Sequence, residues 1–75
     1  MTLGTAGRGT VCRVMRIELP TKVRRRLGIL GMTDGCAVTV MNTGKNGAVI
    51  IKVRGVRLAL GRKFAEKISV GGADR

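Results

Sequence analysis

A dense run of basic side chains is the most chemically distinctive stretch of this sequence. Arg24, Arg25 and Arg26 follow Lys22, with only Val23 between them. Guanidinium groups are planar, always charged at neutral pH, and bind carboxylates or phosphates through two parallel hydrogen bonds. Such a run is often no more than a solvated face. The functional alternative is a docking surface for an anionic partner, in which Arg24 and Arg25 point into solvent.

The other reactive residue types are too sparse to predict catalysis. The chain has no histidine, which is the commonest general base near neutral pH. No GxxxxGK[ST] nucleotide-binding loop is present, and the four acids form no pairing motif: Glu18, Asp34, Glu66 and Asp74. The sequence therefore predicts a protein that is not an enzyme, with no catalytic residues and no cofactor.

A metal site is not predicted either. Transition-metal ions are usually held by imidazole and carboxylate ligands, or by thiolates in clusters. Cys12 and Cys36 are 24 positions apart without CxxC spacing, and both lie in strand-like runs. A thiol in such a run usually acts as a small buried hydrophobe. Two cysteines do not make the disulfide framework of a small secreted domain, so we expect a reducing compartment.

The charge balance is strongly positive, because fifteen Lys and Arg stand against four Asp and Glu, a net charge of +11. This exceeds the roughly 2–8 charges that keep a small domain soluble, and it favours encounter with anionic partners. Nucleic acid, an anionic membrane surface and an acidic protein surface all fit. The sequence shows no signal peptide and no apolar run near the roughly 20 residues that span a bilayer, so we expect a cytoplasmic protein.

The hydrophobic pattern predicts a single, mainly β domain over residues 1–75, with an ordered core at about 9–70. Residues 1–9 are expected to form a flexible lead-in. The irregular alternation of the first strand is consistent with a bulge or with two partly covered faces. Tight turns are expected at Asn46-Gly47 and at Gly55. The expected strands span residues 11–18, 37–42, 49–54, 56–60 and 67–70.

Residues 20–30 switch to helical spacing. Val23, Leu27 and Leu30 lie at i, i+4 and i+7 and form one apolar stripe, and Gly31 is placed for a left-handed stop. Gly28 costs up to about 1 kcal/mol relative to alanine, so this helix depends on packing. A helical turn is expected at 62–66. Five short strands, tight turns and one inserted helix indicate a small SH3-like five-stranded β-barrel.

The order of these features resembles the FeoA family (ferrous iron transport protein A). The segment RRRLGILG at 24–31, the turn TDG at 33–35 and the strand AVTV at 37–40 match the family's arginine- and leucine-rich helix, turn glycine and Val-x-Val strand. Later, IKVRG at 51–55, LAL at 58–60 and ISV at 68–70 are similar to its remaining strands. The chain departs from the family in three places. Gly28 is unusual inside the helix, and many members have a proline at the position of Asp34 and a proline-containing loop in place of Asn46-Gly47.

The resemblance implies a non-catalytic accessory of bacterial ferrous iron uptake. Its partner would be FeoB, the membrane iron permease, contacted through its cytoplasmic GTP-binding domain. Anionic lipid headgroups at the inner face of the plasma membrane would add attraction. An apolar centre near the helix ends would complete the contact. The partner-binding residues expected on this interpretation are Leu19, Lys22, Arg24, Arg25 and Met32.

The alternative function is a small basic barrel that binds nucleic acid through its phosphate backbone. Recognition of single strands relies on aromatic stacking platforms, and this chain has one aromatic residue, Phe64. Nucleic acid is therefore the less favoured partner, and its binding would depend strongly on salt. Polyproline recognition is discarded because it needs a groove lined by aromatic side chains.

Overall fold

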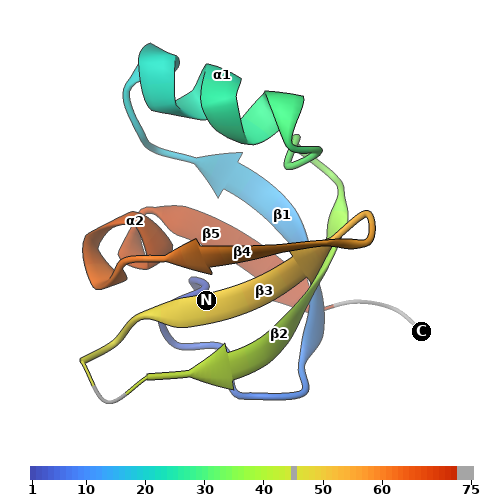
Figure 1. The fold of residues 1–75 in the computed structure, drawn as a ribbon, viewed down its shortest axis with the longest axis vertical. Coiled ribbons are helices and arrows are strands. Elements are labelled where there is room, and N and C mark those ends of the chain that lie inside the picture. Colours follow the sequence, from blue (N-terminus) through green and yellow to red (C-terminus); the bar gives the residue numbers. More distant parts are fainter. Residues whose placement is uncertain (45, 73–75) are drawn as a thin grey trace.

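The computed structural model describes residues 1–44 and 46–72, and it consists of one curved antiparallel sheet with two helices (Figure 1). The mainly β prediction, with five strands, an inserted helix and a later helical turn, is confirmed. No strand or helix end differs from its expected position by more than two residues. The elements are β1 (Val11–Ile17), α1 (Thr21–Ile29), β2 (Ala37–Thr43), β3 (Val49–Val53), β4 (Val56–Leu60), α2 (Arg62–Glu66) and β5 (Ile68–Gly72).

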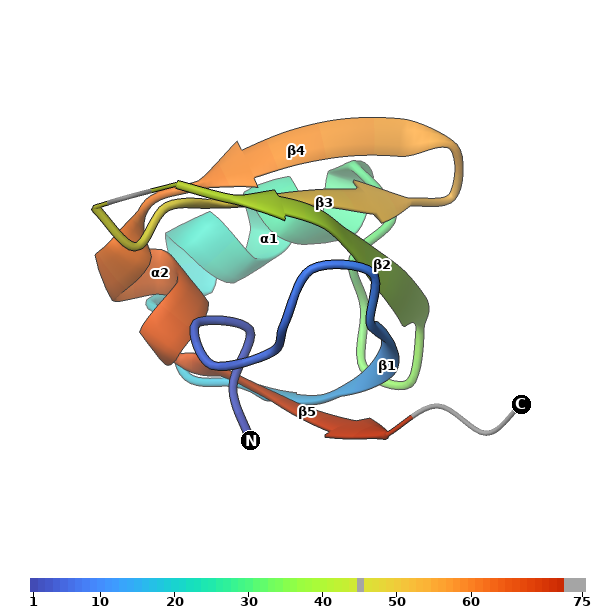
Figure 2. The same ribbon diagram turned by 90° about the horizontal axis from the view of Figure 1, so that it is seen from below.

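The strand order is β4-β3-β2-β1-β5, with every neighbouring pair antiparallel. The register shifts between Val14 and Arg16 in β1 and between Val40 and Asn42 in β2. Bulges of this kind bend a strand and increase its twist, which curls the sheet (Figure 2). The bulge in the first strand is thus confirmed. Within the described residues no ladder joins β4 to β5, so the sheet curls without closing through hydrogen bonds.

Alternating aliphatic side chains from the strands fill the interior. In β3, for example, Val49, Ile51 and Val53 are buried while the residues between them are exposed. Cys12 is fully buried in the same core, as expected for a small hydrophobe, and Cys36 is half-buried. Burial raises the pKa of the Cys12 thiol, and negative charge on Cys36 raises it further. Among the described residues, none that is polar or charged is buried, so this core is apolar.

The N-terminal segment belongs to this core, so the expected flexible lead-in is wrong. The side chain of Leu3 is fully buried, and its N–H donates to the carbonyl oxygen of Ile68 at 3.0 Å. Thr2 forms a β-bridge with Ser69. Figure 2 shows the segment crossing the end of the barrel opposite α1. Packing therefore starts at Leu3 rather than near Gly9, and the N-terminal segment adds buried apolar surface to a domain whose small size limits its core.

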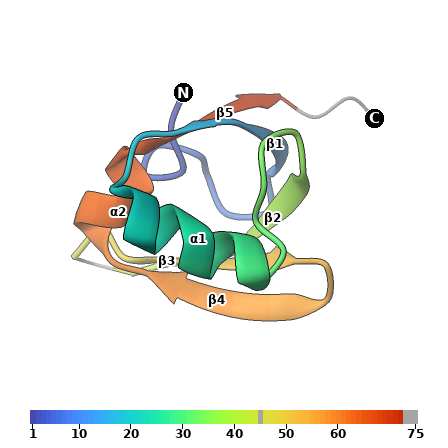
Figure 3. The same ribbon diagram turned by 90° about the horizontal axis from the view of Figure 1, so that it is seen from above.

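Helix α1 lies across the other end of the curved sheet (Figure 3). It packs through Leu27, which is buried, and Val23, which is half-buried against the core. Leu30 was expected to complete this stripe but is 42% exposed, because it caps the helix instead of continuing it. No helix of the described ranges has both the length and the apolar character needed to cross a membrane.

The end of α1 redirects the chain into the core. The N–H of Gly31 donates to the carbonyl of Gly28 at 3.0 Å, and the N–H of Met32 donates to that of Leu27 at 2.9 Å. This pair of bonds is a Schellman motif, which needs the left-handed backbone of Gly31 (φ 102°). The predicted left-handed stop is confirmed. The motif also brings Met32 against the core, where it is 1% exposed.

Candidate functional site: a basic cleft beside helix α1

An open cleft of about 410 Å³ lies beside α1. Charged, hydroxyl-bearing and apolar side chains meet in it, so it is our candidate functional site. Three segments form it: the end of β1, the side of α1 that carries Arg24 and Arg25, and the loop that leads from α1 toward β2. We call this set of residues the α1 cleft. It is lined by Ile17, Thr21, Arg24, Arg25, Gly28, Met32, Thr33 and Asp34.

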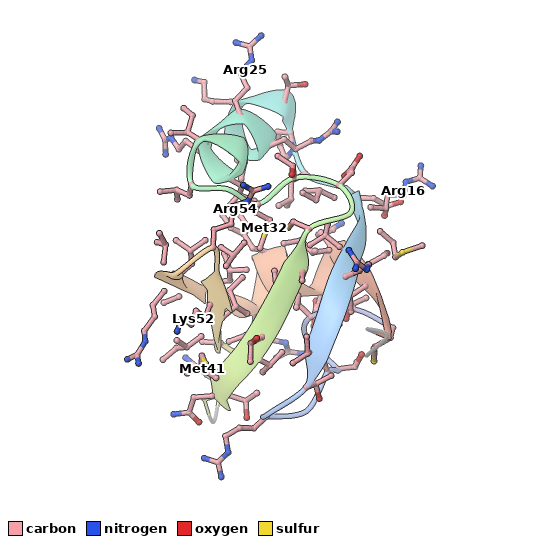
Figure 4. The ribbon with its side chains drawn as sticks, turned by 90° about the vertical axis from the view of Figure 1, so that its right-hand side faces the viewer. Arg16, Arg25, Met32, Met41, Lys52 and Arg54 are labelled. Atoms are coloured by element: carbon pink, nitrogen blue, oxygen red, sulfur yellow. The ribbon has the colours of Figure 1, made fainter. Side chains whose placement is uncertain are left out.

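The basic side of the α1 cleft comes from two neighbouring helix residues. Arg24 and Arg25 are both exposed, and neither forms an ion pair or a side-chain hydrogen bond within the described part of the chain. Figure 4 shows Arg25 projecting from α1 away from the sheet. The first turn of α1 has no acidic residue and no side-chain cap, so its free N–H groups add to the positive potential.

The floor of the α1 cleft is apolar. Ile17 is 7% exposed and Met32 is 1% exposed, and both belong to the core. Thr21 and Thr33 add hydroxyl groups that can donate or accept hydrogen bonds. An apolar floor inside a charged rim is the usual anatomy of a protein–protein contact. Asp34 is the one carboxylate of the lining, and it limits how much negative charge the cleft can hold at that end.

Gly28 keeps part of the cleft open. A Cβ built on Gly28 would meet nothing within 4 Å, and the residue lies inside a regular helix. Neither backbone conformation nor close packing therefore requires glycine here. Its effect is to leave free space in the part of the cleft wall that α1 forms.

The structure places the five expected partner-binding residues in different environments. Arg24, Arg25 and Met32 line the same cleft, whereas Lys22 is exposed on α1 outside it and Leu19 is half-buried against the core. Met32 was expected to supply an accessible apolar contact, but it is buried because the Schellman motif turns it inward. It contributes as the floor of the cleft.

Sequence reasoning missed the rest of the lining. Ile17 was assigned to a strand, Thr21 to the start of the helix, and Thr33 and Asp34 to a turn, and none of the four was assigned to a binding site. The one available signal was Gly28, because a glycine in the interior of a short helix lowers helix stability without an obvious structural reason. The meeting of the helix with the end of β1 and the following loop depends on tertiary packing, which spacing does not reveal.

Metal chemistry has no candidate centre in the described ranges. There, no group of three or more His, Cys, Asp or Glu residues lies close enough to hold an ion. The described cysteines, Cys12 and Cys36, are both free thiols.

Comparison with known proteins places these features in a family. The FeoA domain model matches residues 1–71. A solution structure of FeoA from Chlorobium tepidum is 28% identical with a TM-score of 0.91, and the match covers 99% of this chain and 71% of that one. A crystal structure named iron uptake regulatory protein (FeoA) is 31% identical with a TM-score of 0.81, covering 93% and 92%. No significant match is found among curated protein sequences.

A third structure defines the fold class. Zinc-complexed FeoA from Stenotrophomonas maltophilia, described as a procaryotic SH3 domain protein, is 28% identical with a TM-score of 0.78, and the match covers 95% of this chain and 89% of that one. The predicted SH3-like architecture is thereby confirmed. The chain belongs to the FeoA family of small SH3-like accessory domains associated with ferrous iron transport.

Proposed function

We propose that this protein is a non-catalytic accessory of bacterial ferrous iron uptake that docks on the cytoplasmic GTP-binding domain of the FeoB permease through the α1 cleft. The observation that carries the proposal is the pair Arg24 and Arg25 above an apolar floor, in a chain of the FeoA family. The Stenotrophomonas maltophilia relative has been put forward as a ferrous iron transport activating factor, which supports a role beside a transporter.

The charges of α1 favour docking over a purely structural role. Lys22 lies three residues before Arg25 and four before Arg26, and like charges at these spacings each destabilise a helix by about 0.2–0.5 kcal/mol. Positive charge near a helix N-terminus is also unfavourable. No acidic residue in the first turn offsets either effect. An anionic partner would relieve both.

The chemistry of the α1 cleft indicates what the partner must present. A carboxylate can accept hydrogen bonds from Arg24 or Arg25, and the apolar floor at Ile17 and Met32 can receive an aliphatic side chain beside it. Each charge-assisted hydrogen bond is worth about 1.5–3 kcal/mol when water is excluded. The preferred docking surface on FeoB is therefore an acidic patch with an aliphatic residue next to it.

A cytoplasmic site at the inner face of the plasma membrane fits this proposal. The net charge of +11 would hold the protein near anionic lipid headgroups, where the permease also resides. The proposed role requires no chemical step by the protein itself, because its cleft supplies contacts and not a reacting group. The iron ion is cargo of the permease on this account.

Binding to purified FeoB from the same cell, in lipid nanodiscs, tests the proposal. The wild-type chain is compared with the double variant Arg24→Glu/Arg25→Glu by biolayer interferometry at physiological salt. A matched control, Arg8→Glu/Lys63→Glu, changes the net charge equally at exposed positions outside the cleft. The cleft variant should bind about 100-fold more weakly or worse, because two charge-assisted contacts become repulsive. The control variant should bind FeoB almost as tightly as the wild-type chain.

Two outcomes would contradict the proposal. Equal losses in the two variants would mean that long-range charge, not the cleft, drives association. Retention on a mixed-sequence oligonucleotide at the same salt, without retention on FeoB, would favour the nucleic-acid alternative instead.

A further inference from the structure

The two edge strands of the sheet are β4 and β5, and within the described ranges only β5 has its outer edge covered by another segment. On β5, the N–H of Leu3 donates to the carbonyl of Ile68, and the N–H of Val70 donates to the carbonyl of Met1 at 2.8 Å. The N-terminal segment therefore covers the outer edge of β5. No described residue covers β4 in this way, and Figures 2 and 3 both place β4 along the margin of the molecule. Exposed edges are normally covered or blunted, because they template pairing with another chain.

The register identifies which groups on β4 are free. Arg54 and Gly55 both have positive φ (51° and 81°) and form the two-residue turn between β3 and β4. In such a hairpin the residues flanking the turn, Val53 and Val56, form a hydrogen-bonded pair, and pairs alternate from there. The N–H and C=O groups of Arg57 and Ala59 therefore point away from β3. Both residues are exposed.

The charges beside this edge are unbalanced. Lys52 on β3 and Arg57 on β4 are direct cross-strand partners, and like charges directly opposite each other destabilise a sheet. Neither forms an ion pair within the described residues. Figure 4 shows Lys52 projecting outward from the sheet. Carboxylates on a third strand next to Arg57 would attract both cations and so offset the repulsion between them.

The other face of the edge is apolar and incompletely covered. Val56 is 41% exposed and Leu58 is half-buried, because β4 leaves the barrel unclosed. Leu30 at the end of α1 is 42% exposed, and the adjacent Gly31 packs against Arg54 of the β3–β4 turn. An added strand would therefore meet positive charge on one face and aliphatic surface on the other.

We propose that the free edge of β4 binds an extended protein segment in which acidic and aliphatic residues alternate. The segment would pair with the backbone groups of Arg57 and Ala59, place its carboxylates toward Arg57 and Lys52, and place its aliphatic side chains toward Val56 and Leu58. This is strand addition, in which backbone hydrogen bonds give affinity and alternate side chains give specificity. A second copy of this chain is disfavoured, because each copy carries a net charge of +11.

A designed peptide tests the proposal without knowledge of the natural partner. The probe is an acetylated, amidated seven-residue peptide of alternating Glu and Val, and the control has the same composition with the four Glu placed before the three Val. Amide hydrogen exchange is followed by NMR on the full chain. The amides of Arg57 and Ala59 should exchange freely alone and become at least tenfold protected with the alternating peptide only.

Two variants make the test specific. Ala59→Pro removes a donor that β3 does not use, so the fold should persist while protection at Arg57 is lost. Arg57→Glu should abolish binding of the Glu/Val peptide and permit binding of a Lys/Val peptide. The cleft variant Arg24→Glu/Arg25→Glu should bind the alternating peptide about as well as wild type, because the edge is a separate surface from the α1 cleft.

Several results would overturn the proposal. Protection of Arg57 and Ala59 in the free protein would mean that the edge is already covered. Equal binding of the two peptides would mean that net charge, and not strand pairing, accounts for the binding. A concentration-dependent dimer that Ala59→Pro abolishes would identify a second copy as the occupant.

Discussion

The side chain of Arg54 lies against Gly31 so closely that a Cβ on Gly31 would come within 2.8 Å of Arg54 Cδ. Figure 4 shows Arg54 between the β3–β4 turn and the end of α1, beside Met32. This contact joins the hairpin to the helix that bears the arginines. The glycine suits the left-handed backbone at this position, and a Cβ there would also require the side chain of Arg54 to shift.

Gly31→Ala should therefore destabilise the protein by more than left-handed strain alone. The matched control is Gly35→Ala, whose φ is 85° but whose Cβ would meet nothing within 4 Å. The control should lose about 1–2 kcal/mol of unfolding free energy, and Gly31→Ala about 1 kcal/mol more. Adding Arg54→Ala to Gly31→Ala should recover the difference. Urea unfolding measures all of these variants, and an equal loss in the two glycine variants would contradict the packing argument.

Gly28 allows stability and binding to be separated. Gly28→Ala should raise the unfolding free energy by about 0.5–1 kcal/mol, since the site is helical and its Cβ would be uncrowded. For a domain of this size, that is about 2–8 °C in Tm. Gly28→Leu should keep the fold but fill the α1 cleft and weaken FeoB binding at least tenfold. Undiminished binding by Gly28→Leu would place the contact elsewhere.

The N-terminal segment should be a structural element. Leu3→Ala is expected to lower the unfolding free energy by about 2–5 kcal/mol, because a fully buried side chain is replaced by a cavity. Ile29→Ala, at a residue that is 85% exposed, should change stability by less than about 0.5 kcal/mol. Comparable small changes for both variants, measured by thermal and urea unfolding, would show that the segment contributes nothing.

Stability should fall in alkaline solution partly through Cys12. Burial, reinforced by negative charge on Cys36, raises the pKa of the Cys12 thiol in the folded state. The unfolded chain releases this proton first, so the unfolding free energy falls as pH rises past the ordinary thiol pKa of about 8.5. Cys12→Ala should flatten this part of the stability–pH curve relative to wild type. An unchanged slope would mean that groups other than Cys12 cause the fall in stability at alkaline pH.

The strands and helices were largely predictable because local periodicity and turn chemistry agree with the fold. In β3 the alternation of Val49, Ile51 and Val53 matches the buried face, and Gly31 ends the helix as its position indicated. The N-terminal segment was not predictable from pattern. Leu3 and Ala6 are too few, and too surrounded by glycine, to produce a periodic signal, and their burial depends on contacts with β5.

The site was predictable in its charge but not in its shape. The basic run identified Arg24 and Arg25, because charged residues on the exposed side of an amphipathic helix follow from helical spacing alone. The cleft beside them requires Ile17 and Thr33 from other segments, and Met32 turns inward through a motif of backbone hydrogen bonds. Such meetings are set by tertiary packing, which a single sequence does not encode locally.

A titration of the isotope-labelled chain with the cytoplasmic domain of FeoB, followed by amide NMR shifts, tests the central claim most directly. The account predicts that the largest shifts fall on residues of the α1 cleft, among them Thr21, Arg25, Gly28 and Thr33, and that they vanish in Arg24→Glu/Arg25→Glu. Saturating FeoB domain that leaves these amides unshifted, or that shifts only residues far from α1, would contradict it.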